Sequence, residues 1–404
     1  MAYNVCFPGG AMLTGQVAES ELPVESTYQL GGAAAIMTPA LIIYSDIVEA
    51  NIRNTIRLLR GDTNRWRPHV KTAKLAMTMK LIMRQGVKQF KCATSLELLS
   101  LCENGAEDVL LAYTALGANA ARVCEIANRY PHVAVSALID DEKNLGAWKG
   151  SAVGLFLDLN SGMDRTGMPL AGMERIMGLI ASMEKAAIPF RGLHCYEGHL
   201  AGLQLPERTR RAHAIYDQLF AVIDRLKKHG IAVPELVTSG SPAFVCALSH
   251  AAWPGGAKLW RVSPGTVVYG DSSSMAQLPG TGYSPGAVVL TRVVSAPSAT
   301  LITCDAGHKT LSFDRGIPNC VVAGYPQAQP LGPSEEHLPV NIAACASAPA
   351  LGELLYLIPR HVCPTVNNFD HALIASEGRI VEIQKVTARG REIPLEGVGL
   401  VKQG

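Results

Sequence analysis

The chain has 404 residues and a mass of 43.0 kDa, which is too long for one ordinary domain core. Hydrophobic residues make up 48% and charged residues 17%, a balance that excludes extensive disorder. Lys plus Arg total 36 against 34 for Asp plus Glu, a net charge of +2. Because nucleic-acid binding requires a concentrated basic field, no nucleic-acid partner is expected.

The ten cysteines are scattered along the chain without a CxxC pair. This spacing indicates buried thiols in a reducing compartment rather than a disulfide framework. The N-terminal residues show no cationic region followed by an apolar run, and every apolar stretch is broken before it reaches a bilayer span. We therefore expect a cytoplasmic protein with no membrane partner.

Residues 1–37 lack clear periodicity and are expected to form an N-terminal extension. From there, short β-branched runs alternate with amphipathic stretches, as in β/α units. Strands are expected at 41–44, 66–70, 89–93, 109–112, 133–138, 153–157, 192–196, 235–238 and 259–262. Helices are expected at 46–60, 73–84, 96–104, 119–129, 170–187 and 207–229. Without the first strand, the other eight predict a TIM (β/α)8 barrel over residues 45–278.

After about residue 278 the chain becomes rich in Gly, Pro, Val and Thr, and no long helical period appears. Short strands are expected at 286–294, 300–303, 319–322, 354–358, 373–376 and 380–385. This texture predicts an all-β C-terminal domain over residues 279–404.

The expected strand 66–70 leads into Lys71, within Arg-Pro-His-Val-Lys-Thr at 67–72. A lysine at the end of an apolar barrel strand would lie at the barrel mouth, where low-dielectric surroundings suit it to forming a Schiff base. The alternative is a plain surface lysine on the following loop.

Two further strand ends carry polar clusters. Asp164 and Arg165 lie between two glycines at 162–167, which indicates either a turn at the barrel mouth or an ordinary Asx-type turn. Residues 192–199 contain a tyrosine, a glutamate and two histidines around a strand end and a Gly turn. One histidine alone is usually structural, but four such side chains together favour a site.

The last two barrel strands lead into loops that are small, hydroxyl-rich and glycine-bearing. They contain Ser239, Gly240 and Ser241 in one loop, and Gly265 and Thr266 in the other. Loops in this position commonly bind phosphate through backbone N–H groups and hydroxyls.

His361 and Cys363 follow a short strand of the second domain. On an extended segment, residues two apart point to the same side, so both side chains would reach one ion. Imidazole plus thiolate suits Zn²⁺. The alternative is a buried cysteine beside a capping histidine.

Together these segments resemble the D-threonine aldolase / D-serine dehydratase family, within the alanine-racemase-like, fold-type III pyridoxal phosphate enzymes. The similar segments occur in family order over about residues 38 to 386. They lie at 38–40, 67–72, 162–167, 196–199, 263–266, 305–309, 334–337 and 361–366.

The resemblance implies that Lys71 holds pyridoxal 5′-phosphate and relays protons. It places further cofactor-binding groups at His69, Arg165, Tyr196, Ser239, Gly240, Ser241, Gly265 and Thr266, with Tyr196 also catalytic. His199 would be the general base of an aldolase reaction. His361 and Cys363 would hold a divalent ion that contacts the substrate β-hydroxyl, zinc in preference to manganese or magnesium.

In this family the first strand pairs with the β-domain, so residues 38–44 would join 279–404. A homodimer acting on a small D-amino acid is also implied. The reaction would be either the aldolase or the dehydratase type. Cys363 favours zinc and dehydration, whereas the surroundings of Lys71 are aldolase-like. The alternatives are an amino-acid racemase on the same fold and, third, a cofactor carrier without catalysis.

Overall fold

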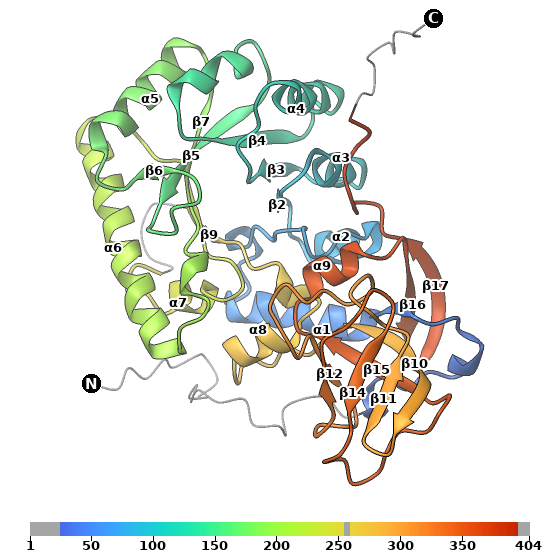
Figure 1. Ribbon diagram of the computed structural model, residues 1–404. Helices are drawn as coiled ribbons and strands as arrows, with labels where there is room; N and C mark the ends of the chain where they lie inside the picture. The colour runs from blue at the N-terminus through green and yellow to red at the C-terminus, as the bar shows by residue number, and fades with distance from the viewer. Residues whose placement is uncertain (1–24, 254–258, 395–404) are drawn as a thin grey trace, which may run out of the picture.

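The computed structural model describes residues 25–253 and 259–394. The β/α alternation builds a curled parallel sheet in the order β2-β3-β4-β5-β7-β8-β9, with the short β6 paired to β5 (Figure 1). Its strands are β2 Gln89–Cys92, β3 Asp108–Leu111, β4 Ala134–Ile139, β5 Gly154–Asn160, β6 Met168–Pro169, β7 Phe190–Cys195, β8 Glu235–Thr238 and β9 Leu259–Val262.

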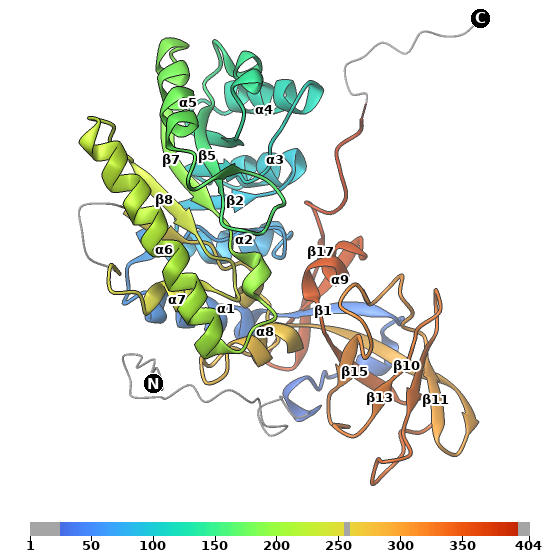
Figure 2. The same cartoon turned by 60° about the vertical axis from the view of Figure 1, so that its left-hand side comes forward.

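The helices of this part form where apolar residues recur at helical spacing. They are α1 Ser45–Leu58, α2 Ala76–Arg84, α3 Ser95–Glu103, α4 Ala118–Arg129, α5 Met173–Lys185, α6 Leu205–Lys228, α7 Phe244–Leu248 and α8 Ser272–Gln277. In α1, for example, Val48, Ile52 and Thr55 are buried on one face. Helices α3 to α6 lie around the outside of the parallel sheet (Figures 1 and 2).

The sequence predicts a barrel strand at 66–70, but this segment forms no continuous strand. Trp66 makes an isolated parallel bridge to β9, and His69 makes one to β2. Pro68 has no N–H to donate, which prevents a regular ladder here. The segment therefore lies between the two outer strands of the curled sheet, in place of the eighth strand of the predicted closed barrel.

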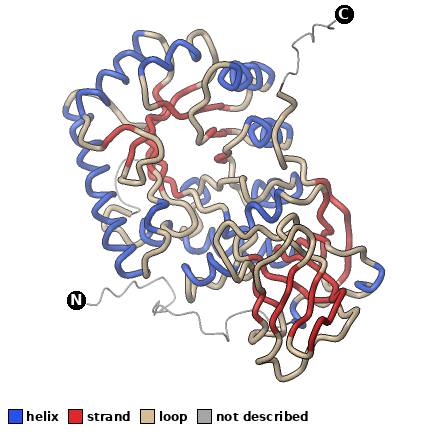
Figure 3. Tube along the Cα trace, in the orientation of Figure 1, coloured by secondary structure: helices blue, strands red, loops and turns tan. Residues whose placement is uncertain are grey.

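The second part of the fold is a mainly antiparallel sheet, seen as a separate group of strands in Figure 3. Its strands are β1 Ala40–Tyr44, β10 Ala287–Ser298, β11 Leu301–Cys304, β12 Cys320–Val322, β13 Gln329–Pro330, β14 Leu338–Asn341, β15 Leu354–Pro359, β16 His371–Ser376 and β17 Arg379–Lys385. Strand β1 pairs with β10 and β16, so the first strand belongs to this sheet. The short helix α9, Val362–Asn367, follows β15.

Residues 25–37, part of the expected extension, pack on the antiparallel sheet. The Tyr28 hydroxyl donates to the Pro285 carbonyl at 2.9 Å, and the Leu30 N–H donates to the Tyr356 hydroxyl at 3.3 Å. The rest of the extension, including Cys6, lies outside the described residues. Every cysteine that the structure describes is a free thiol. Within the same described part, no helix combines the length and apolar character needed to cross a bilayer.

Candidate active site

A cavity of about 550 Å³ lies between the carboxyl ends of the parallel strands and the α9 region of the other sheet. That volume is typical of a small-molecule site. Most of the predicted site residues line it: His69, Lys71, Arg165, Tyr196, Gly240, Ser241, Gly265, Thr266, His361 and Cys363. Chain segments far apart in sequence therefore converge on one site.

Lys71 presents an unpartnered amine to this cavity. Its Nζ makes no hydrogen bond or ion pair with any described residue, while its backbone N–H donates to Nδ1 of His69 at 3.3 Å. Burial lowers the pKa of His69 well below its ordinary value, and the charges of Lys71 and Lys91 lower it further. His69 is therefore neutral near pH 7 and available as a hydrogen-bond acceptor.

Tyr196 is held in place by two glycines. A Cβ added at Gly198 would lie 2.3 Å from Cε1 of Tyr196, and one added at Gly240 would lie 2.9 Å from Cε2. The guanidinium of Arg165 lies over the ring, 5.1 Å from its centroid. The ring is thus fixed at the wall of the cavity by close packing rather than by a long flexible contact.

Ser239 does not line the cavity, although the resemblance implies that it binds the cofactor. Its hydroxyl donates to Oε1 of the buried Glu197 at 2.6 Å, and its N–H donates to the other oxygen at 3.2 Å. Tyr216 also donates to Glu197, at 2.5 Å. Glu197 therefore ties the ends of β7 and β8 together and turns Ser239 away from the cavity.

His199 also lies away from the cavity. It is exposed, on the 3-10 turn Gly198–Leu200 that follows β7. The turn begins after Tyr196 and Glu197, and a Cβ added at Gly162 would lie 3.9 Å from Nε2 of His199. The imidazole therefore lies beside the 162–167 turn rather than in the cavity wall, and the role of His199 as a general base stays a prediction.

The two glycine-bearing loops expected to bind phosphate meet at the cavity. The Thr266 N–H donates to the Ser241 hydroxyl at 3.0 Å and joins them. A Cβ added at Gly265 would lie only 2.2 Å from the backbone oxygen of His69, so no larger residue fits at this position. This close approach holds the Gly265 loop against the segment that carries Lys71.

His361 and Cys363 both line the cavity, but not on the extended segment predicted from sequence. The backbone turns into α9 after His361, and Pro364 is tolerated in the first turn of that helix. Nδ1 of His361 lies 2.7 Å from Oδ2 of Asp314, and the Cys363 Sγ lies 2.9 Å from the Thr72 hydroxyl. The helix turn, rather than strand alternation, therefore brings the imidazole and the thiol together.

The electrostatic surroundings of Cys363 favour a thiolate. Burial raises the pKa of this thiol, but the hydrogen bond from His361 and the charge of Lys71 lower it below its ordinary value. A thiolate and an imidazole are good zinc ligands. The two residues form a pair only, since no group of three or more His, Cys, Asp and Glu arranged for a metal occurs in the described part of the chain.

Three further groups line the cavity, of which the sequence interpretation included His194 only in the cluster at 192–199 and did not single out Lys91 or Asp158. Lys91, Asp158 and His194 line it from β2, β5 and β7. Nδ1 of His194 lies 2.7 Å from Oδ1 of Asp158, and Nε2 lies 3.5 Å from the Lys91 Nζ. An ionisable residue inside each strand was the available signal, but it does not reveal which strands face one another.

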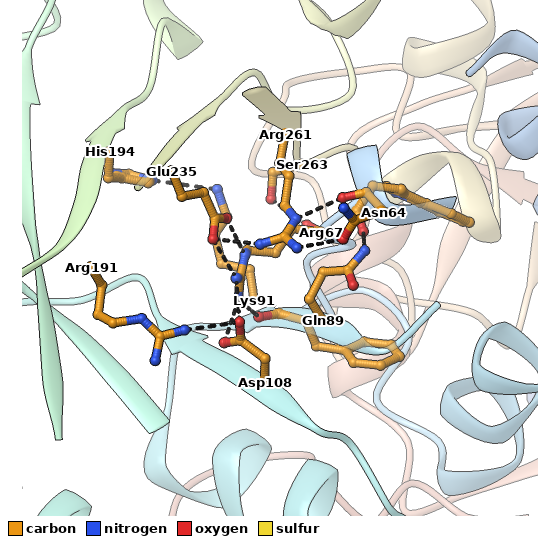
Figure 4. A network of polar contacts seen from close by, with 12 residues as sticks. Asn64, Arg67, Gln89, Lys91, Asp108, Arg191, His194, Glu235, Arg261 and Ser263 are labelled. Atoms are coloured by element: carbon orange, nitrogen blue, oxygen red, sulfur yellow. Dashed lines mark hydrogen bonds and ion pairs between the residues drawn. The ribbon is translucent and has the colours of Figure 1, made fainter. Parts of the chain in front are cut away.

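A network of charged side chains lies at the amino-terminal ends of the strands, opposite the cavity (Figure 4). Arg67 is fully buried and binds Glu235 at 2.8 Å and Asp108 at 2.9 Å. Arg261 also binds Glu235, and Arg191 also binds Asp108. This network closes the interior of the curled sheet opposite the cavity.

A curled parallel α/β sheet, a cavity at its strand ends, an unpartnered lysine and two glycine loops define a small-molecule-binding α/β protein. Residues 43–273 match the family Alanine racemase, N-terminal domain, and residues 286–375 match Putative serine dehydratase domain. The first match covers more than half of the chain, so the chain belongs to the family of the alanine racemase N-terminal domain.

Characterised relatives are similar over most of their length. A D-threonine aldolase of Arthrobacter sp is 23% identical over 88% of this chain and 94% of its own. A 3-hydroxy-D-aspartate aldolase of Paracoccus denitrificans is 25% identical over 88% and 93%. The crystal structure of D-threonine aldolase from Filomicrobium marinum superimposes with a TM-score of 0.81 at 25% identity, covering 92% and 99% of the two chains. These matches confirm the resemblance inferred from the motifs.

Proposed function

We propose that this protein is a pyridoxal phosphate- and divalent-metal-dependent lyase that acts on D-3-hydroxy amino acids. One observation carries the proposal: the unpartnered amine of Lys71 shares a cavity with the paired side chains of His361 and Cys363. The names of the two aldolase relatives, which span most of the chain, support the substrate class.

The cavity residues fit this cofactor. Lys71 supplies an amine for covalent attachment, and the Gly240–Ser241 and Gly265–Thr266 loops supply backbone N–H groups and hydroxyls for its phosphate. Tyr196 and Arg165 supply an aromatic wall and a cation. When bound, pyridoxal phosphate withdraws electrons from the substrate α-carbon.

His361 and Cys363 would hold the metal ion, zinc in preference to manganese or magnesium because one ligand is a thiol. Asp314 would orient the imidazole through its Nδ1, leaving Nε2 for the ion. From this position the ion would bind the β-hydroxyl of the substrate and polarise it as a Lewis acid.

Two reactions are compatible with this arrangement. If the β-hydroxyl loses its proton, the Cα–Cβ bond breaks and glycine and an aldehyde form. If the α-proton is removed instead, the hydroxyl leaves, and a 2-oxo acid and ammonia form. The aldolase relatives favour the first reaction, whereas Cys363 and the match of residues 286–375 to a serine dehydratase domain favour the second.

D-Threonine distinguishes the two reactions. The protein is supplied with pyridoxal phosphate and Zn²⁺ or Mn²⁺, and the products are identified. Glycine with acetaldehyde shows the aldolase reaction, and 2-oxobutyrate with ammonia shows the dehydratase reaction. If neither D-threonine nor any other D-3-hydroxy amino acid is cleaved, the proposal is overturned.

We expect His361→Ala to lower lyase turnover on the order of 10²-fold or more, because the Lewis acid loses a ligand. Excess metal should restore part of the rate. A racemase on the same fold would need no metal, so unchanged turnover of D-alanine to L-alanine in this variant would support the racemase alternative. The measurement is the initial rate with both substrates across a metal titration.

Gly265→Ala should weaken binding of pyridoxal phosphate at least about tenfold, which is ~1.4 kcal/mol. The added Cβ would clash with the His69 backbone and push the phosphate loop outward. Gly202→Ala is the matched control, because a Cβ there meets no atom within 4 Å. Spectroscopic titration of the cofactor-free protein measures both affinities, and equal affinities would contradict a phosphate role for this loop.

A further inference from the structure

The cavity contains a second lysine that the proposed reaction does not yet use. Lys91 lies on β2 and is 4% exposed. Its amine contacts Nε2 of His194 at 3.5 Å, and the structure gives it no carboxylate partner among the described residues. Lys74, which is 5% exposed, instead binds Glu97 at 2.5 Å. The ion pair with Glu97 gives Lys74 a structural role. Lys91 is exceptional because its buried amine has no such carboxylate partner among the described residues.

A chain of hydrogen bonds positions the amine of Lys91. Asp158 and His194 are direct neighbours across β5 and β7, and Nδ1 of His194 lies 2.7 Å from the Asp158 carboxylate. Thr166 donates to the other Asp158 oxygen at 2.7 Å. With its Nδ1–H directed to Asp158, a neutral His194 leaves Nε2 free to accept a hydrogen bond from Lys91. Figure 4 shows Lys91 and His194 joined in this way beside the Arg67 network.

Charges of both signs surround the Lys91 amine. Burial lowers the pKa of its amine to about 7, and the nearby cations Lys71 and Arg67 lower it as well. Glu197 and Asp158 act in the opposite direction. His69, from the neighbouring segment, and His194, from β7, are both held neutral by burial. Lys91 is therefore able to give or take a proton at neutral pH, when an ordinary lysine is fully charged.

We propose that Lys91 is a further catalytic residue of this cavity, a general acid–base for bond formation at the Nζ of Lys71, and that His194 and Asp158 are its positioning residues. The inference rests on the proposed function, because it assumes that Lys71 reacts with an aldehyde. No described carboxylate forms an ion pair with the Lys91 amine, so its proton is not held by a fixed anion.

Lys91 gives up one proton and takes one back during formation of the C=N bond. When the neutral Lys71 amine adds to an aldehyde carbon, one of its protons passes to the carbonyl oxygen, so that the carbon carries a hydroxyl group. The Lys91 ammonium donates a proton to this hydroxyl, which leaves as water while the nitrogen lone pair forms the C=N bond. The nitrogen then gives its remaining proton to the neutral Lys91 amine. Lys91 ends in its starting state, and the net products are the C=N bond and one water.

The test is the rate at which pyridoxal phosphate attaches to cofactor-free protein, followed by absorbance across the neutral pH range. We expect the native protein to show an inflection near pH 7. Lys91→Met should attach on the order of 10²-fold more slowly and lose the inflection, because the acid–base group is gone. Borohydride reduction and peptide mapping should place the cofactor on Lys71 in both proteins.

Two variants control this experiment. Lys88→Met, an exposed lysine just before β2, should behave as the native protein. His194→Gln keeps the amine but disrupts the chain to Asp158, so it should shift the inflection and slow attachment less than Lys91→Met. Methionine matches the lysine stem and places no charge in the interior, so Lys91→Met should fold, as thermal unfolding would verify.

The outcomes separate this inference from the proposed function. If Lys91→Met attaches the cofactor at the native rate with the native pH dependence, the role of Lys91 is overturned while the lyase proposal stands. If the native protein attaches no cofactor at Lys71, both are overturned. Slow attachment with a lost inflection supports the role of Lys91 whether or not D-threonine is the preferred substrate.

Discussion

Lys71→Met should abolish turnover, with a loss on the order of 10⁴-fold or more, as expected when the group that forms a covalent bond is removed. Methionine fills the same volume but cannot attach an aldehyde. The Nζ of Lys71 makes no contact with a described residue that stabilises the fold, so the variant should remain folded. Initial rates with D-threonine and the absorbance of bound cofactor measure the effect.

The cavity holds two lysines, so the site of attachment must be mapped directly. After borohydride reduction, the native protein should carry one cofactor on Lys71 and none on Lys91. Lys88→Met, which removes an exposed amine, should retain both turnover and label. A label found on Lys91, or persisting in Lys71→Met, would show that the catalytic lysine has been assigned to the wrong residue.

Arg67→Met should destabilise the fold by about 3–5 kcal/mol, the cost of leaving buried charges without their partner. Arg67 is fully buried and donates to Glu235 at 2.8 and 2.9 Å, to Asp108 at 2.9 and 3.0 Å and to the Phe90 carbonyl at 3.1 Å (Figure 4). Denaturant unfolding at neutral pH measures the loss. Lys88→Met, in the exposed pair Lys88–Glu107, should change stability little.

The loss of stability in Arg67→Met should depend on pH. Burial raises the pKa of the Asp108 carboxyl, but the Arg67 ion pair lowers it below its ordinary value overall. Its contribution to stability is therefore present above the unfolded-state pKa of about 4 and is lost as pH falls through the folded-state pKa. Arg67→Met lacks this contribution, so the difference from the native protein should narrow on acidification. A difference that is constant with pH would mean that lost packing, rather than lost charge pairing, causes the effect.

Local sequence patterns predicted much of the fold because they act over a few residues. The expected strand at 235–238 is β8, and that at 259–262 is β9. The expected helix at 96–104 differs by one residue at each end from α3, which begins after Thr94 caps it by accepting from the Glu97 N–H. Apolar runs, helical periodicity and caps are local signals, so the order of strands and helices could be predicted from them.

The residues that share the cavity could be anticipated only in part. Tyr196 and Gly265 follow the ends of β7 and β9, Lys71 follows the segment that bridges β9 and β2, and the carboxyl ends of parallel strands meet at one edge. His361 and Cys363 reached the same cavity for a different reason from the one predicted, because α9 replaces the extended segment. The pattern of residue types thus indicated that His361 and Cys363 lie together, although the backbone that brings them together differs from the predicted one.

Side-chain direction was decided by tertiary contacts. Ser239 belongs to a loop with the composition expected for phosphate binding. Its hydroxyl instead donates a hydrogen bond to Glu197, 42 positions away, and this bond turns the Ser239 side chain away from the cavity. His199 is exposed on a short turn and lies beside Gly162 rather than in the cavity wall. Local sequence does not predict the direction of either side chain, because each depends on the residues at the neighbouring strand ends and turns.

The sequence by itself indicated the family and the β/α order, since motifs and periodicity are properties of short segments; the role of Lys71 as the reactive amine stays a prediction. Only the tertiary structure brought Lys91, His194 and Asp158 together, from β2, β7 and β5. In sequence, each lies on a different short strand, and nothing local shows that the three face one another. Curling of the sheet makes them neighbours, because it turns the inner faces of these separate strands toward one cavity.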